Sequence, residues 1–413
     1  MTQSDRRFTP QPFSSDVASG LASEPEQRVT LRGPAELADA LPYLLGYHPD
    51  DSIVVIAVHG EHGRFGGRIR LGIPSVPQEW PEAARQVAEC LLAGSEAEGD
   101  RPTGAVLYLC QDARSGEEPS AVPVRLRPLA QELRAACVAL DMPVFEALCL
   151  SGGRFWSFCC DDPRCCPPEG IELRPPGSSP MAAAATYAGI RVQGTLKELA
   201  ARLAPLAPHR APLQEQALDT AAADLLPRML DVSAKEIVRA RTLELAAHLL
   251  GRFSSSPPAA GRCPSEVDVS DDARISEAEA AALIVGLQDR ITRDRAAEWM
   301  EGVDAQPALR LWRALGRRCV GAFTEYAAAP LTLAGWVSWS TGDETNARVA
   351  LSAALEADPE CVFARLLHSA CNSGLDPEPL RGTLRGQRAA HGGRPEACRG
   401  AGAGPGPRPG PEA

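Results

Sequence analysis

The sequence SIVVIAV (52–58) is a run of apolar residues in which five of seven are β-branched. A short run of this kind, bounded by turn-forming residues, is typical of a strand that is buried in a sheet. The residues Arg64–Ile73 follow a turn at His59–Gly63 and can return beside the first strand in the antiparallel direction. The stretch 52–73 therefore predicts a hairpin whose first strand lies in a sheet core.

Further elements are predicted on both sides of this hairpin. Before and after it we expect a strand and two helices: Arg28–Leu31, Pro34–Leu45 and Trp80–Leu92. A second round has the same order of strand, helix, strand, strand, helix: Gly104–Cys110, Val122–Leu140, Val144–Leu150, Arg154–Cys159 and Pro180–Gly189. The rounds share element order with little residue identity, so duplication of one unit is an open alternative. In either case we predict an α/β domain over 27–192, with helices covering a mixed sheet of about six strands.

The β pattern stops after Gly194, and capping boxes at Thr195, Ser233 and Ser276 indicate helix starts. We therefore predict an all-α C-terminal region, made of a helical extension (193–253) and a helical domain (273–378). The polar stretch SSSPPAAGRCPSEVDVSDD (254–272) is interpreted as a linker between them. The termini, 1–26 and the Arg/Gly/Pro-rich 379–413, are predicted to be disordered because they lack apolar periodicity.

The segment Leu331–Pro359 has the residue spacing of one tetratricopeptide-like helix pair. Its small residues, which include Gly335 and Ala347, allow two antiparallel helices to approach closely, and Pro359 ends the second helix. A packed helical hairpin is preferred over a peptide-binding groove, because a stable array needs about three such units. Trp336 and Trp339 are interpreted as a core pair.

The composition excludes two classes of partner. The chain carries 42 basic and 53 acidic residues, and this net charge of −11 excludes a generally basic binder of nucleic acid or of anionic membranes. The N-terminus lacks the apolar region of a secretory signal, and the longest uncharged stretch, Tyr326–Gly342, is too short and interrupted to span a bilayer. We expect a soluble, cytoplasmic protein whose 13 cysteines are reduced.

Reactive side chains are dense in FCCDDPRCCPPEG (158–170). Cys160 and Cys165 have four residues between them, which falls within the spacing of paired zinc ligands, and Cys166 is the next candidate. Cys159 or the distant His48 could complete a tetrahedral site. Structural thiols in a proline-braced turn and a redox role are the alternatives, since the rest of the chain offers no second closely spaced pair.

The segment YHPDDS (47–52) joins a predicted helix to the buried strand. It is interpreted as a loop in which an aspartate forms a turn; the alternative is a polar cluster at the sheet edge with His48 as base or ligand and Asp51 nearby. The glycine-rich 59–67 matches neither a P-loop nor a dinucleotide-binding fingerprint, and hydrolase signatures are absent from the sequence. No catalytic or cofactor-binding residue is therefore named, and whether the protein is an enzyme is left undecided.

Three segments together resemble the actinobacterial family described only as domain of unknown function 4192: LPYLLGYHPDDSIVVIAV (41–58), RFWSFCCDDPRCCPPEG (154–170) and TGDETNARVALSAALEADP (341–359). The resemblance covers roughly Arg28–Ser373 and implies a bacterial cytoplasmic protein; it carries over no activity or site residue. We expect a non-enzymatic regulatory or scaffold module that docks a protein partner through its helical region. The alternative is a metal-binding or thiol-based enzyme or sensor centred on the Cys159–Cys166 loop.

Overall fold

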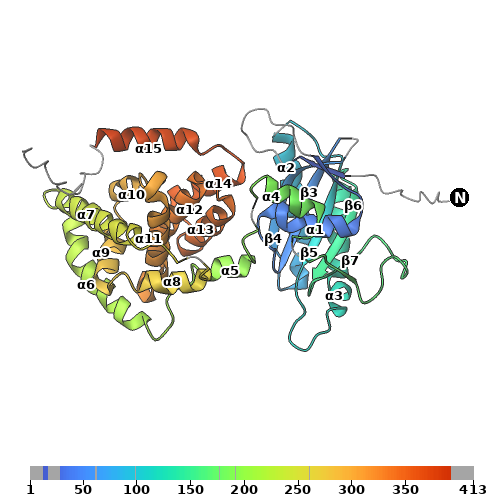
Figure 1. The fold of residues 1–413 in the computed structure, drawn as a ribbon, viewed down its shortest axis with the longest axis horizontal. Coiled ribbons are helices and arrows are strands. Elements are labelled where there is room, and N and C mark those ends of the chain that lie inside the picture. The colour runs from blue at the N-terminus through green and yellow to red at the C-terminus, as the bar shows by residue number, and fades with distance from the viewer. Residues whose placement is uncertain are drawn as a thin grey trace, which may run out of the picture. The chain divides into compact units, whose positions relative to one another are not determined.

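A computed structural model describes residues 13–16, 28–60, 63–97, 99–175, 177–190, 192–259 and 261–391. The chain divides between Ala201 and Arg202 into two compact units, which we call the α/β domain and the helical domain (Figure 1). The boundary lies within the predicted helical extension, so the short helix α5 (Leu196–Ala201) belongs to the α/β domain. None of the helices in these ranges is both long and apolar enough to cross a membrane.

The α/β domain contains one mixed sheet with the strand order β2-β1-β4-β3-β5-β6-β7-β8. The strands are β1 (Phe13–Asp16), β2 (Arg28–Leu31), β3 (Ser52–His59), β4 (Arg64–Gly72), β5 (Gly104–Cys110), β6 (Val144–Ser151), β7 (Arg154–Ser157) and β8 (Ile171–Glu172). All eight residues of β3 are buried, and β3 pairs antiparallel with both β4 and β5. The six predicted strands are thereby confirmed, and β1 and the two-residue β8 are added.

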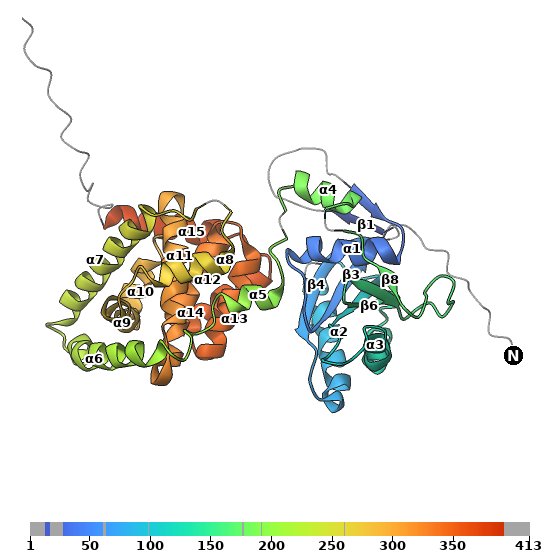
Figure 2. The ribbon, with the colours of Figure 1, turned by 60° about the horizontal axis from the view of Figure 1, so that its bottom comes forward.

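Helices cover both faces of this sheet. The helices α1 (Pro34–Leu45) and α4 (Pro180–Tyr187) pack on the face that contains Val54 and Ile56, and α2 (Trp80–Ala97) and α3 (Ala121–Ala139) pack on the face that contains Ile53 and Val55. Figure 2 shows the two pairs of helices on opposite sides of the sheet. Alternate residues of β3 thus enter different cores, which is why its sequence is apolar throughout.

The repeated element order does not correspond to a repeated arrangement. The first helix of each round is α1 and α3, and these helices lie on opposite faces. In the second round β5 pairs with β6, whereas in the first round β2 lies at the sheet edge and does not pair with β3. The sheet therefore gives no support to a duplicated unit.

The N-terminal prediction needs a correction at β1. Phe13–Asp16 pairs antiparallel with β2, with Phe13 opposite Leu31, although 1–26 was predicted to be disordered. This four-residue strand is too short and too polar to show a sheet period in the sequence. The rest of that prediction, 1–12 and 17–26, lies outside the described residues.

The helical domain is built around two buried helices, which are α11 and α12 in the chain order below. Its helices are α6 (Ala211–Leu230), α7 (Lys235–Ser254), α8 (Pro264–Asp272), α9 (Glu277–Gly286), α10 (Arg290–Ala296), α11 (Ala305–Arg317), α12 (Ala328–Ser340), α13 (Glu344–Ala357), α14 (Val362–Asn372) and α15 (Glu378–Ala390). Every residue of α12 is buried, and Trp336 and Trp339 meet edge to face with centroids 5.9 Å apart, as a core pair should.

The predicted helical hairpin is α12 and α13. A Cβ atom on Gly335 would lie 2.6 Å from the Leu351 Cγ atom, so only glycine permits this approach, and Ala347 is fully buried beside it. Since α12 is enclosed on all sides, this pair forms the core of the domain.

Two of the three predicted capping boxes form. The Ser276 hydroxyl accepts from the Glu279 amide, and Thr195 pairs with Glu198 in the same way. The Ser233 hydroxyl instead donates to Asp231, 2.7 Å away, and α7 begins at Lys235 without a side-chain cap. Asp231 therefore competes successfully for the serine.

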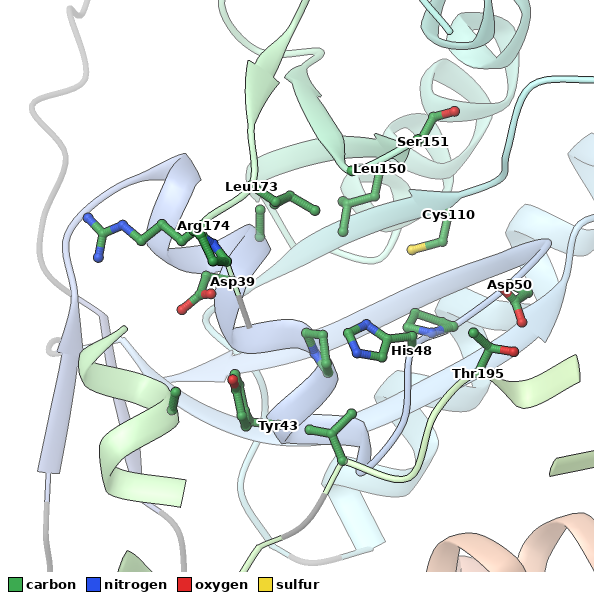
Figure 3. A pocket seen from close by; sticks show the side chains of 18 of the residues that line it. Asp39, Tyr43, His48, Asp50, Cys110, Leu150, Ser151, Leu173, Arg174 and Thr195 are labelled. Carbon is green, nitrogen blue, oxygen red and sulfur yellow. The ribbon is translucent and has the colours of Figure 1, made fainter. Parts of the chain in front are cut away.

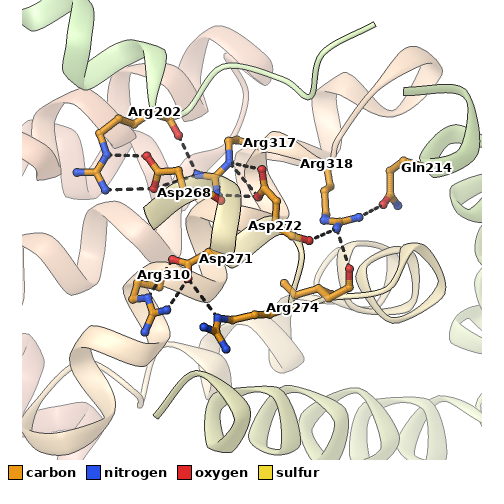
Figure 4. A network of polar contacts seen from close by, with 10 residues as sticks. Arg202, Gln214, Asp268, Asp271, Asp272, Arg274, Arg310, Arg317 and Arg318 are labelled. Carbon is orange, nitrogen blue, oxygen red and sulfur yellow. Dashed lines mark hydrogen bonds and ion pairs between the residues drawn. The ribbon is translucent and has the colours of Figure 1, made fainter. Parts of the chain in front are cut away.

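The predicted linker 254–272 is wrong over its second half, which is α8. Asp268, Asp271 and Asp272 fall on one face of this helix and are buried against arginines. Arg202 binds Asp268 at 2.8 and 3.1 Å, and Arg317 binds Asp272 with a closest contact of 2.7 Å (Figure 4). The sequence predicts a solvated linker here because the arginines that neutralise these acidic residues are distant in sequence.

The predicted C-terminal tail, 379–413, also needs a correction, because 378–390 forms α15. Leu384 is buried, and Arg385 donates to both carboxylate oxygens of Glu301 at 2.8 Å. Arg388 binds Asp304 at 2.6 Å. The arginines of this segment therefore form specific ion pairs. The rest of the predicted tail, 392–413, lies outside the described residues.

Candidate functional site

A cavity of about 1040 Å³ opens at the carboxyl ends of the parallel strands β5 and β6 (Figure 3). This edge of an α/β sheet is where ligands generally bind, because the loops that leave parallel strands diverge there. The walls come from α1, the loop 48–51, the strand ends at 110–112 and 150–153, the segment 173–177, α4, and the segment 192–197.

One wall is a chain of polar contacts around Asp51. The Lys197 Nζ atom lies 2.7 Å from Asp51 Oδ2, and Gln111 Nε2 donates to Asp51 Oδ1 at 3.1 Å. Arg125 in turn donates to Gln111 and pairs with Glu117. Burial alone would raise the pKa of Asp51, but the hydrogen bonds from Lys197 and Gln111 outweigh it and hold this pKa below its usual value.

The backbone of Asp51 has φ 41°, the left-handed region that few residues other than glycine adopt. The loop that contains it is fixed by neighbouring backbone bonds. His48 donates its amide to the Gly194 carbonyl at 2.8 Å, and its carbonyl accepts from the Leu196 amide at 3.1 Å. The Lys197 amide donates to Asp50 Oδ2 at 3.1 Å. The segment 194–197 therefore holds the whole loop in place.

The segment 47–52 can now be compared with the two interpretations of its sequence, a loop with a turn and a polar cluster at the sheet edge. Gly46, with φ 82°, ends α1 as predicted. The structure also places His48, Asp50 and Asp51 together in the cavity wall at the sheet edge, which is the arrangement of the functional alternative. No other catalytic group joins His48, whose ring makes no hydrogen bond to a carboxylate in the described part of the chain.

The ends of the cavity differ in their side chains. Figure 3 shows Asp39 and Arg174 toward one end and Asp50 and Thr195 toward the other. Asp112 accepts from the Gly152 amide at 2.9 Å, whereas the half-buried Asp39 of α1 has no hydrogen-bond or ion-pair partner among the described residues. Asp39 is thus the carboxylate of the lining that is left for a ligand.

Apolar groups form part of the remaining lining. Figure 3 shows Cys110, Leu150 and Leu173 on one side and Tyr43 across from them. Burial raises the pKa of the Cys110 thiol far above its usual value, so this cysteine is a protonated, apolar part of the wall. It lacks the thiolate that a nucleophile needs.

The cysteine loop forms a second cluster in the same domain. The sulfur atoms of Cys160, Cys165 and Cys166 all lie within 4.8 Å of one another. Partial burial and the neighbouring thiols of Cys160 and Cys165 raise the pKa of Cys166 to about 12. The sequence-predicted trio is thus brought together in space.

The other proposed ligands do not join this trio. The thiol of Cys159 lies beside Glu146 instead, and desolvation together with the negative charge of that carboxylate raises the pKa of Cys159 to about 11. His48 lies in the cavity, whose described lining includes none of the three clustered cysteines. The cavity and the cysteine cluster are therefore two separate sites.

Sequence reasoning missed most of the cavity. Asp39, Gln111, Arg174 and Lys197 come from four segments, and none of these segments carries a motif for ligand binding or catalysis. The signal that could have indicated the site is the end of two neighbouring parallel strands, β5 and β6, but their pairing is known only from the fold.

Comparisons with known proteins identify a family but no activity. No curated protein and no solved structure matches the chain. A family model described as "Domain of unknown function (DUF4192)" matches residues 34–378, which is well over half of the chain and includes parts of both domains. The chain therefore belongs to the DUF4192 family.

Proposed function

We propose that this protein is a non-enzymatic regulatory protein whose α/β domain binds a small organic molecule in the sheet-edge cavity. One observation carries the proposal: polar side chains from separate chain segments surround a space of about 1040 Å³ that also has an apolar wall. Ligand sites in proteins are typically ~300–1,000 Å³ and combine an apolar lining with a few polar groups.

The charges of the lining support a ligand with hydrogen-bond donors. Among the described residues of the lining, the carboxylates of Asp39, Asp50, Asp51 and Asp112 outnumber the cationic side chains of Arg174 and Lys197. Lys197 is already paired with Asp51, so the carboxylates are in excess. An amine, or a hydroxyl-rich molecule, would complete this site, whereas a phosphate would be repelled.

A non-enzymatic role is supported by the candidate reactive groups. The Cys110 thiol is protonated, and the His48 ring lacks the orienting carboxylate of a catalytic pair among the described residues. The predicted protein partner of the helical region and the cytoplasmic location stay predictions. The tetratricopeptide-like sequence spacing supports a partner, but every residue of α12 is buried, so α12 itself offers no surface to that partner.

The ligand proposal is tested by thermal melting of the full chain with named probes. The probes are putrescine and agmatine as amines, myo-inositol as a polyol, and ATP and inorganic phosphate as anions. We expect an amine or the polyol to raise the melting temperature in a saturable manner, and Asp39→Asn to weaken that binding by ~tenfold or more, the equivalent of one strong hydrogen bond.

The matched control is Glu132→Gln, an exposed carboxylate on α3, which lies on the opposite face of the sheet. This variant should bind like the parent. Stabilisation by ATP or phosphate that Asp39→Asn leaves unchanged would contradict the proposal, as would a lack of response to all five probes.

A further inference from the structure

We propose that Cys160, Cys165 and Cys166 bind one zinc ion as three thiolates. The proposal goes beyond ligand binding in the cavity, because the described cavity lining includes none of these cysteines. It rests on the position of the three sulfur atoms, on the loop that holds them, and on their exposure compared with the cysteines of the hydrophobic cores.

The sulfur positions fit one ion. All three sulfur atoms lie within 4.8 Å of one another. Zinc–sulfur bonds of ~2.3 Å in a tetrahedron place sulfur atoms ~3.8 Å apart. The cluster therefore needs to contract by at most ~1 Å per pair, which side-chain rotation can supply.

Hydrogen bonds of the backbone hold the loop in this arrangement. The amides of Cys165 and Cys166 both donate to the Asp162 carbonyl, at 3.0 and 2.8 Å, and the Arg164 amide donates to Asp162 Oδ1 at 2.9 Å. This turn presents two adjacent cysteines to Cys160, which lies just after β7. Adjacency in sequence is therefore no obstacle to shared ligation here.

The far side of the loop is anchored to β7. The Trp156 Nε1 atom donates to the Pro168 carbonyl at 2.9 Å, and a Cβ atom on Gly170 would lie 2.5 Å from the Trp156 ring. Gly170 also has φ 77°, so it satisfies both the turn and the contact. Because the loop is already fixed at both ends, it loses less conformational entropy when it binds a metal.

The burial of the trio separates it from the structural thiols of the chain. Cys110, Cys137, Cys149 and Cys319 are buried among apolar side chains, as free cysteines usually are. Cys165 is exposed, and Cys160 and Cys166 are only partly buried. The three clustered sulfur atoms lie near the surface, so they do not contribute to a hydrophobic core. They are accessible to an ion from solution.

The charges beside the cluster are balanced, and the cluster has three ligands. Asp162 pairs with Arg164 at 3.0 Å, and Asp161 lies 3.9 Å from Arg127. No fourth cysteine, histidine or carboxylate of the described residues joins the group. The fourth position would thus be open to water or to a small ligand, as in zinc sites that act on an exchangeable group.

The test uses the full chain, stripped of metal under reducing conditions and then titrated with Co²⁺ and Zn²⁺. We expect one equivalent of metal per chain by elemental analysis, and a thiolate-to-cobalt charge-transfer absorption that zinc abolishes. Cys160→Ser, Cys165→Ser and Cys166→Ser should each weaken metal binding more than ~tenfold, because each removes a ligand.

Cys159→Ser is the matched control, since its thiol faces Glu146, and it should bind metal like the parent. Circular dichroism and melting of each variant separate lost ligation from lost folding. Absence of the charge-transfer band in folded parent protein would overturn the proposal, as would a disulfide between two of the three cysteines in protein purified with reductant. Asp39→Asn should keep full metal binding, so this test and that of the cavity fail independently.

Discussion

Lys197 and Asp51 form an ion pair, 2.7 Å between Nζ and Oδ2, that ties the segment after α4 to the start of β3. Lys197 is one of only two lysines in the chain, the other being Lys235. The pair forms part of the cavity wall, and it fixes the aspartate whose backbone is in the left-handed region. It adds a link between two side chains to the backbone hydrogen bonds that already join the loop 48–51 to the segment 194–197.

Lys197→Met should weaken this wall without unfolding the domain. Both side chains are about half exposed or more, so the expected loss in unfolding free energy is below ~1 kcal/mol. The larger effect is on Asp51, whose pKa should rise because a hydrogen bond that lowers it is removed. NMR titration of the Asp51 carboxyl measures this change. Lys235→Met should leave it unaltered, because the Lys235 side chain forms no ion pair with any described residue and lies in the other domain.

Asp272→Ala should destabilise the helical domain by ~3 kcal/mol, because it removes the closest carboxylate of the buried Arg317 guanidinium and leaves only Asp268, 3.6 Å away. Urea denaturation measures the loss. Asp224→Ala removes an exposed pair with Arg228 and should cost under ~0.5 kcal/mol. Equal effects of the two substitutions would contradict the buried network of Figure 4.

Shortening the chain tests whether α15 stabilises the helical domain. A chain ending at Pro377 loses buried Leu384 and the three arginines that bind Glu301 and Asp304, so its melting temperature should fall by several degrees. The comparison is a chain ending at His391, which keeps the whole helix. Identical melting curves for the two chains would show that α15 contributes nothing.

Glu301 should make this stabilisation depend on pH. The hydrogen bond from Arg385 lowers the pKa of Glu301 from 4.5 to about 2. Partial burial opposes this shift, and the hydrogen bond from Arg381 adds to it. A carboxylate with a lowered pKa in the folded state stabilises the protein above its unfolded pKa, and the contribution is lost as pH falls from about 4.5 to about 2. Glu301→Gln should flatten the stability curve in that window, whereas Glu356→Gln, an exposed change on α13, should leave its slope unchanged.

Ala347→Glu should destabilise the helical domain by ~3 kcal/mol or more, because this fully buried position faces Gly335 across the helical hairpin and has no partner for a charge. The exposed Glu360→Ala provides a surface control of about zero effect. Thermal or urea unfolding distinguishes them, and parent-like stability of Ala347→Glu would mean that the hairpin packs differently.

The elements that were predicted correctly are those whose signal is local. β3 is apolar throughout, a glycine ends α1, and the spacing of small residues indicates the pairing of α12 with α13. Each of these signals lies within the element that it predicts. The elements that were missed depend on distant partners. β1 exists because β2 pairs with it, and α8 is buried because arginines of α11 neutralise its aspartates. The same division holds for the sites, since the cysteine loop is contiguous while the cavity draws on segments that only the fold brings together.

The anchoring of Trp156 to the cysteine loop has a practical consequence. Its indole donates to Pro168, two residues after Cys166, so its fluorescence should respond when the loop tightens or when a quenching ion such as Co²⁺ enters. Of the six tryptophans in the chain, only Trp80 shares the α/β domain with it. A change in emission that Trp156→Phe abolishes would therefore report occupancy of the loop as an optical signal, without an added dye.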